Sequence, residues 1–175
     1  LYLSLPSLIF SFGWLRWYWA GLCTGLLVLA LVESTRMIFQ QVTAADSSSD
    51  TSSGTSPRLP SRHLIFLFVI ALGWLSIAGV GGVGHQHTDW QKHESILADL
   101  VNYRWPVIYD LYDLPHPLVY YLAYYLPAAL VGKVGGWAGA QVTLFVWTYI
   151  GLILSMLWFW LLVHKASAKA AYATF

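Results

Sequence analysis

Hydrophobic residues along this chain occur in long runs that are separated by polar segments. Uninterrupted or nearly uninterrupted apolar stretches cover residues 17–32, 64–80, 117–134 and 141–163, and another apolar stretch covers residues 1–15. A helix needs about 20 mostly apolar residues to cross a bilayer. We therefore expect four membrane-spanning helices, with residues 1–15 as a fifth or a truncated one.

The composition agrees with this pattern. Of the 175 residues, 58% are hydrophobic and 10% are charged, whereas soluble domains have about 25% charged residues. The net charge of +1 gives no reason to expect nucleic-acid binding, and a single cysteine, Cys23, excludes an intrachain disulfide. We predict an all-α, polytopic transmembrane helical bundle in the plasma (inner) membrane, in contact with membrane lipids.

Changes in composition divide the chain into three parts. Residues 1–33 are predicted to form one or more transmembrane helices, and residues 34–62 a disordered Ser-rich linker, because they contain too little apolar surface to fold. Residues 63–175 are predicted to form transmembrane helices with a polar loop at residues 81–116. Because the chain begins inside apolar sequence without a Met, we expect it to be part of a longer protein.

The polar loop contains one predicted helix. Thr88 and Gln91 fit a capping box, and Asp89 would lie in the first turn, where the helix dipole favours a carboxylate. Apolar residues then recur at near-helical spacing until Pro106. We predict an amphipathic helix that lies in the membrane interface, followed by an irregular segment over residues 107–116.

The start of this loop is rich in metal-binding residue types. His85 and His87 share one side of an extended segment, and Asp89 and His93 share one face of a helix. Together they could bind a divalent metal such as Mg²⁺, Mn²⁺ or Zn²⁺. The alternative is a hydrated interfacial loop in which the histidines bind nothing.

Charged residues of the loop suggest two further roles. Asp89 could act as a general base, since an apolar surrounding raises the pKa of a carboxyl group; stabilisation of the helix N-terminus explains the same residue without chemistry. Lys92 and Arg104 could contact lipid headgroups or the phosphate of a substrate.

Four tyrosines follow the loop, at positions 120, 121, 124 and 125. Tyrosine favours the membrane interface, where its ring is in an apolar environment and its hydroxyl is hydrated. An aromatic belt is therefore one interpretation of Tyr120, Tyr121, Tyr124 and Tyr125. The other is a groove for a lipid chain or a sugar ring.

Several of these segments resemble bacterial multi-pass glycosyltransferases of the GT-C class. The resemblance covers roughly residues 64–163 and depends on four stretches, Thr88-Asp-Trp-Gln-Lys-His93, Ile96-Leu-Ala-Asp-Leu100, Trp105-Pro-Val107 and Tyr120-Tyr-Leu-Ala-Tyr-Tyr-Leu-Pro-Ala-Ala129. The paired acidic motif that the class often has in this loop is absent, because Asp89 has no adjacent acid.

The resemblance implies an enzyme that uses a polyprenyl-phosphate-linked sugar, often with a divalent metal. Asp89 would be its base or metal ligand, and the loop would face the cell exterior. The class has many more spans than this chain, so the chain would be inactive alone. The alternative is a non-enzymatic membrane protein, either a transporter or an assembly subunit.

Overall fold

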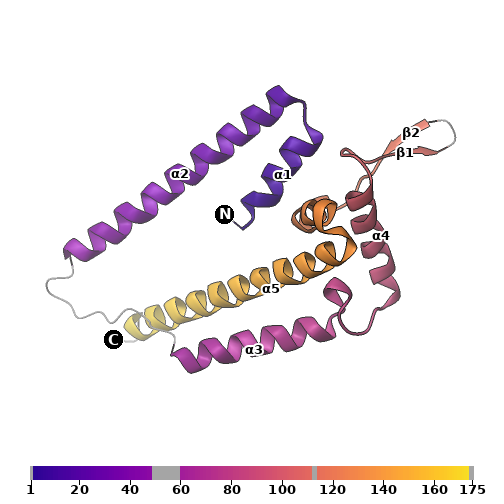
Figure 1. Ribbon diagram of the computed structural model, residues 1–175. Coiled ribbons are helices and arrows are strands. Elements are labelled where there is room, and N and C mark those ends of the chain that lie inside the picture. The colour runs from indigo at the N-terminus through magenta and orange to yellow at the C-terminus, as the bar shows by residue number, and fades with distance from the viewer. Residues whose placement is uncertain (1, 49–59, 112–113, 174–175) are drawn as a thin grey trace. The chain divides into compact units, whose positions relative to one another are not determined.

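Helices form over most of the predicted apolar runs, but the bounds of the helices differ from those of the runs. In the computed structural model, which describes residues 2–48, 60–111 and 114–173, most residues are helical (Figure 1). The described residues form the α-helices α1 (Ser4–Trp14), α2 (Trp17–Ser48), α3 (Ser61–Ile77), α4 (Thr88–Asn102) and α5 (Leu126–Ala173). They also form the short 3-10 helices η2 (Val80–Gly82) and η3 (Leu122–Tyr124), and the strands β1 (Ile108–Leu111) and β2 (Leu114–Pro117).

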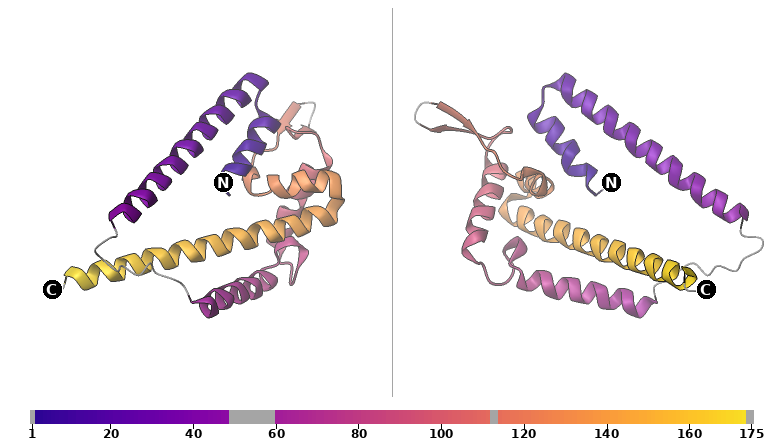
Figure 2. Two further views of the ribbon diagram at one scale, coloured as in Figure 1. Left: turned by 60° about the vertical axis from the view of Figure 1, so that its left-hand side comes forward. Right: turned by 180° about the vertical axis from the view of Figure 1, so that it is seen from behind.

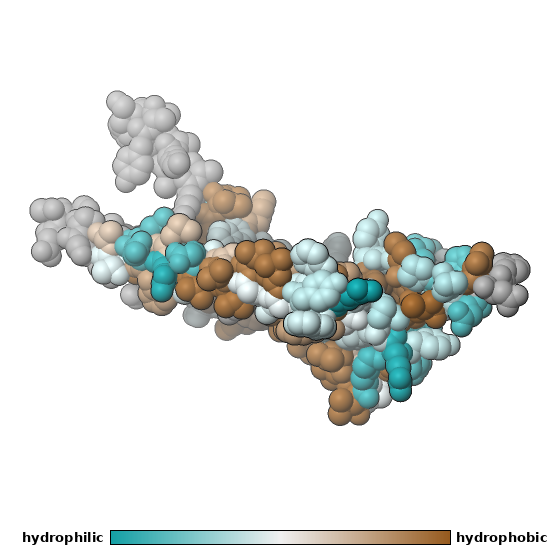
Figure 3. Space-filling view, turned by 90° about the horizontal axis from the view of Figure 1, so that it is seen from above, coloured by the Kyte–Doolittle hydropathy of each residue, from teal (hydrophilic) through white to brown (hydrophobic). Residues whose placement is uncertain are grey.

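Two of the helices are long and apolar enough to cross a membrane. They are α2, over Trp17–Ala44, and α5, over Leu126–His164. A third apolar helix, α3, has 17 residues, which gives a length of about 25 Å, less than the ~30 Å of a hydrocarbon core. Large apolar side chains face outward on these helices, and Figure 3 shows such side chains on one face of the molecule.

The chain divides into two compact units. The first contains Leu1–Ser56 and Tyr103–Leu126, and the second contains Pro57–Asn102 and Pro127–Phe175. In the first unit, α1 turns back at Arg16 into α2 and packs near η3. An aromatic cluster links α1 to Trp105. The ring centroid of Trp14 lies 5.2 Å from the ring centroids of both Phe10 and Trp105.

The second unit is a helical hairpin with a helix across its end. Helices α3 and α5 run side by side, and α4 crosses the end at which the chain leaves α3 (Figures 1 and 2). The Tyr149 hydroxyl of α5 donates to the backbone oxygen of Phe68 on α3, at 3.1 Å. The fully buried Leu97 and Leu100 belong to α4, so the predicted amphipathic helix is present.

Helix α5 is two helices joined at one residue. Gly136 has φ 68° and ψ −168°, a conformation outside the helical region that is open to glycine and costly for other residues. The part before it is short, and the part after it continues the predicted last span. The sequence between residues 137 and 163 contains no Asp, Glu, Lys or Arg.

The predicted span over residues 117–134 is not one helix. Its first residue ends β2, η3 follows, and α5 begins only at Leu126. The helical part ends at the kink, which leaves it too short to cross a bilayer. The predicted spans over residues 117–134 and 141–163 are therefore joined by a kink inside α5 rather than by a loop.

The segment predicted to be irregular forms an antiparallel hairpin, β1–β2. Tyr109 pairs with His116 and Asp110 pairs with Pro115. The Leu118 amide donates to the Val107 oxygen at 2.9 Å, so this pair is a hydrogen-bonded one, and such pairs alternate with pairs that are not hydrogen-bonded. Pro115 and Pro117 fall in the pairs that are not hydrogen-bonded, where the backbone nitrogen points away from β1. Prolines are tolerated there because no ladder hydrogen bond is lost.

The start of the predicted disordered linker is helical in the structure. Helix α2 continues to Ser48, so residues 34–48 of the region 34–62 are helical. Residues 49–59, which include most of its Ser-rich centre, lie outside the described residues. Backbone hydrogen bonds continue the helix here, and an ion pair of 3.1 Å between Arg36 and Glu33 lies on its surface.

Candidate functional site

A glycine-rich turn joins α3 to α4 in the second unit. Helix α3 ends when Gly79 adopts a left-handed conformation with φ 81°, which is a common way to end a helix. A Cβ atom on Gly79 would lie 2.8 Å from both the His85 oxygen and the Trp90 Nε1. At Gly81, which has φ 66°, a Cβ atom would lie 2.6 Å from the Gln141 oxygen. The turn therefore packs closely against α4 and α5.

Polar side chains tie the start of α4 to the end of α3. The Trp90 indole N–H donates to the Ala78 oxygen at 3.0 Å. The Gln86 amide donates to the Gly79 oxygen at 2.7 Å. Both acceptors are carbonyls at the C-terminal end of α3, which have no partner within the helix. These bonds fix the position at which α4 begins.

Replacing Trp90 by Phe tests the hydrogen bond between the Trp90 indole and the Ala78 oxygen. The substitution keeps an aromatic ring but leaves the Ala78 carbonyl without its donor, so we expect a loss of about 1–2 kcal/mol in the free energy of unfolding. The measurement is thermal unfolding of the purified chain in lipid nanodiscs. Trp74→Phe is the matched control, because Trp74 is 70% exposed on α3. Equal stability of the two variants would contradict the role of Trp90.

The predicted metal ligands lie on both sides of the start of α4. His85, His87 and Asp89 are exposed, and His93 is half-buried with its ring 5.2 Å from the ring of Trp90. Within the described part of the chain, no group of three or more His, Cys, Asp or Glu residues is arranged to hold a metal ion. The residues as placed do not fit a metal, so metal binding stays a prediction from the sequence.

The predicted capping box also differs in detail. Thr88 is the first residue of α4 rather than the residue before it, and its hydroxyl lies 3.2 Å from the Nδ1 of His87. Asp89 therefore lies in the first turn, as predicted. Its carboxylate is accessible and stabilises the helix dipole.

Lys92 and Arg104, the predicted phosphate contacts, are both exposed. Lys92 belongs to α4 in the second unit, whereas Arg104 follows α4 and belongs to the first. A contact of either residue with a phosphate or a lipid headgroup stays a prediction.

Three of the four predicted groove residues line a pocket in the first unit. Tyr120, Tyr121 and Tyr124 surround a space of about 730 Å³ with residues of α1 and with Cys23 of α2. Tyr125 is buried beside them rather than lining the space. Burial, together with the neighbouring Tyr120 and Tyr124, raises the pKa of Tyr125.

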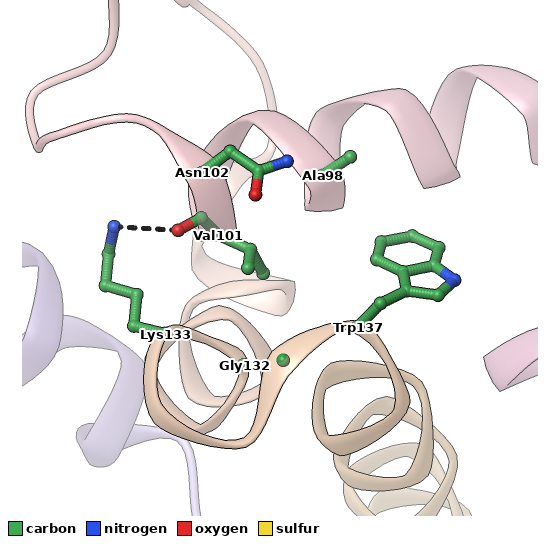
Figure 4. Close-up of a pocket in the computed structure, with 7 residues that line it drawn as sticks. Ala98, Val101, Asn102, Gly132, Lys133 and Trp137 are labelled. Atoms are coloured by element: carbon green, nitrogen blue, oxygen red, sulfur yellow. Dashed lines mark hydrogen bonds between the residues drawn. The ribbon is translucent and has the colours of Figure 1, made fainter.

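A second pocket lies in the second unit, where the end of α4 meets the kink of α5 (Figure 4). It has a volume of about 470 Å³. Its polar and aromatic lining residues are Asn102, Lys133 and Trp137, and small residues complete it. The Lys133 ammonium donates to the Val101 oxygen at 3.3 Å, where the C-terminal end of a helix attracts positive charge.

Sequence reasoning missed this second pocket. The adjacent Gly135 and Gly136 were the available signal, because a glycine pair inside a helical pattern often marks a break. Asn102 and Trp137 are far apart in the sequence, so it gave no sign that they line one pocket. Another contact that sequence reasoning missed joins α4 to α5, where the Gln141 amide donates to the Glu94 carboxylate at 3.3 Å.

Comparison with known proteins gives no relative for this arrangement: no protein-family model, curated protein or solved structure matches the chain.

Proposed function

We propose that the chain is part of a multi-pass membrane protein of the plasma membrane. Support comes from α2 and α5, which are long and apolar and have few buried residues in their most apolar parts. Further support comes from hydroxyl groups on the apolar helices. Ser76, Thr148 and Ser155 each donate to the backbone oxygen four residues earlier, at 2.8 Å. Such bonds satisfy a hydroxyl where water is absent.

The polar segment would then lie at one membrane surface. Helix α4 crosses the end of the α3–α5 pair (Figure 1), and its Lys92 is exposed while Leu97 is buried. A helix with this division of side chains is suited to the interface between headgroups and acyl chains. The proposal puts this end of the α3–α5 pair on the extracytoplasmic side.

For the activity, the proposal is a glycosyltransferase that resembles the GT-C class and uses a lipid-phosphate-linked sugar. Its main support is the position of Asp89, an accessible carboxylate in the first turn of a helix that Trp90 fixes to α3. A general base must be reachable by substrate and held in one place. Asp89 would accept the proton of the acceptor hydroxyl as the glycosidic bond forms, and the lipid phosphate would leave.

Asp89→Asn is the test of this role. In the full-length protein that contains this segment, we expect sugar transfer from a lipid-linked donor to fall about 10²–10⁴-fold, because general base catalysis contributes that much. Asp99→Asn is the matched control, since it removes the same charge from the same helix and should leave the transfer rate within about twofold. Undiminished transfer in Asp89→Asn would remove Asp89 from the reaction.

The second candidate is a non-enzymatic assembly subunit or transporter. This candidate needs no metal, and no group of three or more His, Cys, Asp or Glu among the described residues could hold one. Titration of the purified protein with Zn²⁺ and Mn²⁺, together with chelation during the transfer assay, separates the candidates. Absent transfer in the full-length protein, with or without metal, would favour the subunit or transporter.

A further inference from the structure

The pocket between α4 and the kink of α5 is lined by three residues with different chemical groups, Asn102, Lys133 and Trp137. Figure 4 shows Lys133 and Trp137 on opposite sides of the space, with Gly132 between them and Asn102 on the α4 side. The pocket therefore offers an ammonium, a carboxamide and an indole ring. The carboxamide can both donate and accept hydrogen bonds.

Gly132 lines the pocket and allows close packing there because it has no side chain. A Cβ atom there would lie 2.7 Å from both the Ala140 Cβ and the Val101 Cγ2, so α4 and both parts of α5 approach each other closely at this point. Lys133 belongs to the part of α5 before the kink at Gly136, and Trp137 belongs to the part after it. The kink at Gly136 lies between the lysine and the tryptophan in the sequence, and both residues line the pocket.

We propose that this pocket binds the ring of a saccharide at the membrane surface. A pyranose ring has hydroxyl groups at its edge and a face of C–H bonds. The negative face of the Trp137 indole attracts such partly positive hydrogens, while Asn102 and Lys133 contact hydroxyl oxygens. Sites of this size with one aromatic platform and a few polar groups are typical of small-ligand binding.

The charge of the pocket favours a neutral ring over a phosphate. Lys133 is the only cation among its lining residues, and its ammonium already donates to the Val101 oxygen. The pocket also lies at the C-terminal end of α4, where the unpaired carbonyl groups of a helix carry partial negative charge. These carbonyls accept hydrogen bonds from hydroxyls and repel a phosphate.

This inference rests on the proposed function in one respect: the ring would be the sugar of a lipid-linked substrate. The same chemistry would also bind the headgroup of a glycolipid or a free saccharide. The position suits a membrane ligand, because Trp137 begins the apolar part of α5 that the proposal puts in the bilayer.

The experiment measures binding without any transfer reaction. The full-length protein is reconstituted in phosphatidylcholine nanodiscs, which avoids detergents with sugar headgroups, and is titrated with methyl glucoside and methyl mannoside by saturation-transfer NMR. A second titration uses nanodiscs that contain a glucosyl lipid. We expect saturable binding in at least one series, and about a tenfold loss of affinity in Trp137→Ala because the aromatic face is removed.

Two variants make the result specific. Trp158→Ala removes a 65%-exposed tryptophan from the same helix and should leave the affinity unchanged, whereas Trp137→Phe should lose less affinity than Trp137→Ala. Circular dichroism confirms that each variant is folded. Equal affinity in wild type and folded Trp137→Ala would overturn the proposal, as would displacement of the saccharide by inorganic phosphate. Saccharide binding that persists when Asp89→Asn and wild type transfer sugar equally well would support the pocket and remove only the proposed reaction.

Discussion

Gly81→Ala is expected to destabilise the second unit by about 2–5 kcal/mol. Two physical costs add at this position. A residue with a Cβ atom pays roughly 1–2 kcal/mol for the left-handed conformation, which Gly81 adopts with φ 66°. The new methyl group would also lie 2.6 Å from the Gln141 oxygen and 2.9 Å from the Phe145 Cβ, and such overpacking costs about 1–3 kcal/mol.

Two other glycines separate these costs. Gly136→Ala meets no atom within 4 Å, so it tests backbone strain alone and should cost about 1–3 kcal/mol. Gly135→Ala also meets no atom, and Gly135 has no positive φ, so it should stabilise the helix by about 0.5–1 kcal/mol. Thermal unfolding in nanodiscs measures all three. A Gly81→Ala variant as stable as Gly135→Ala would show that the turn does not pack against α5.

Ile150→Lys is expected to destabilise the reconstituted chain by about 2.5–3.5 kcal/mol, which is the cost of a lysine at the centre of a membrane-spanning helix. Ile150 is 43% exposed and lies near the middle of the part of α5 after the kink. The same substitution on a surface in water would change stability by only about 0.5 kcal/mol. The free energy of unfolding in nanodiscs therefore distinguishes a lipid-facing residue from a water-facing one.

Ile108→Lys provides the matched control. Ile108 is 52% exposed in β1, in the polar part of the chain, and we expect the change there to be within about 0.5 kcal/mol. Alkaline carbonate extraction of membranes gives a second measurement, since Ile150→Lys should increase the extracted fraction. If both lysines are tolerated equally, α5 is not in contact with lipid.

The helical part of the fold could be predicted because apolar runs and breakers are local signals. A helix from Thr88 until Pro106 was expected from Thr88, Asp89 and the apolar spacing, and a helix forms over Thr88–Asn102. The hairpin could not be predicted in the same way. Pro115 and Pro117 indicated irregular structure, and only the pairing of β2 with β1 makes their missing amides harmless.

The long α2 and the interrupted α5 show a second limit of local patterns. Hydropathy gave residues 17–32 as the apolar part of α2, but a helix continues through polar residues when backbone hydrogen bonds continue. Conversely, residues 117–134 are apolar without forming one helix. Hydropathy describes the preferred surroundings of a segment, and backbone geometry is decided separately.

The candidate sites depend on contacts between distant residues. The tyrosine cluster was visible in the sequence because its four members are close together along the chain. In the structure, three of them line one pocket. Lys133 and Trp137 were not identified, since their relation to Asn102 exists only once α4 packs on Gly132. The tie between Trp90 and the Ala78 oxygen was hidden for the same reason.

The positions of the two prolines in β2 give the hairpin one blocked and one open side. At the outer edge of β2, Pro115 and Pro117 present carbonyl groups without amide donors, so an approaching strand would form only half of its ladder there. At the outer edge of β1, Ile108 and Asp110 present both a carbonyl group and an amide N–H. Copies of this chain are therefore hindered from joining edge to edge through β2, which protects a small exposed sheet from open-ended aggregation.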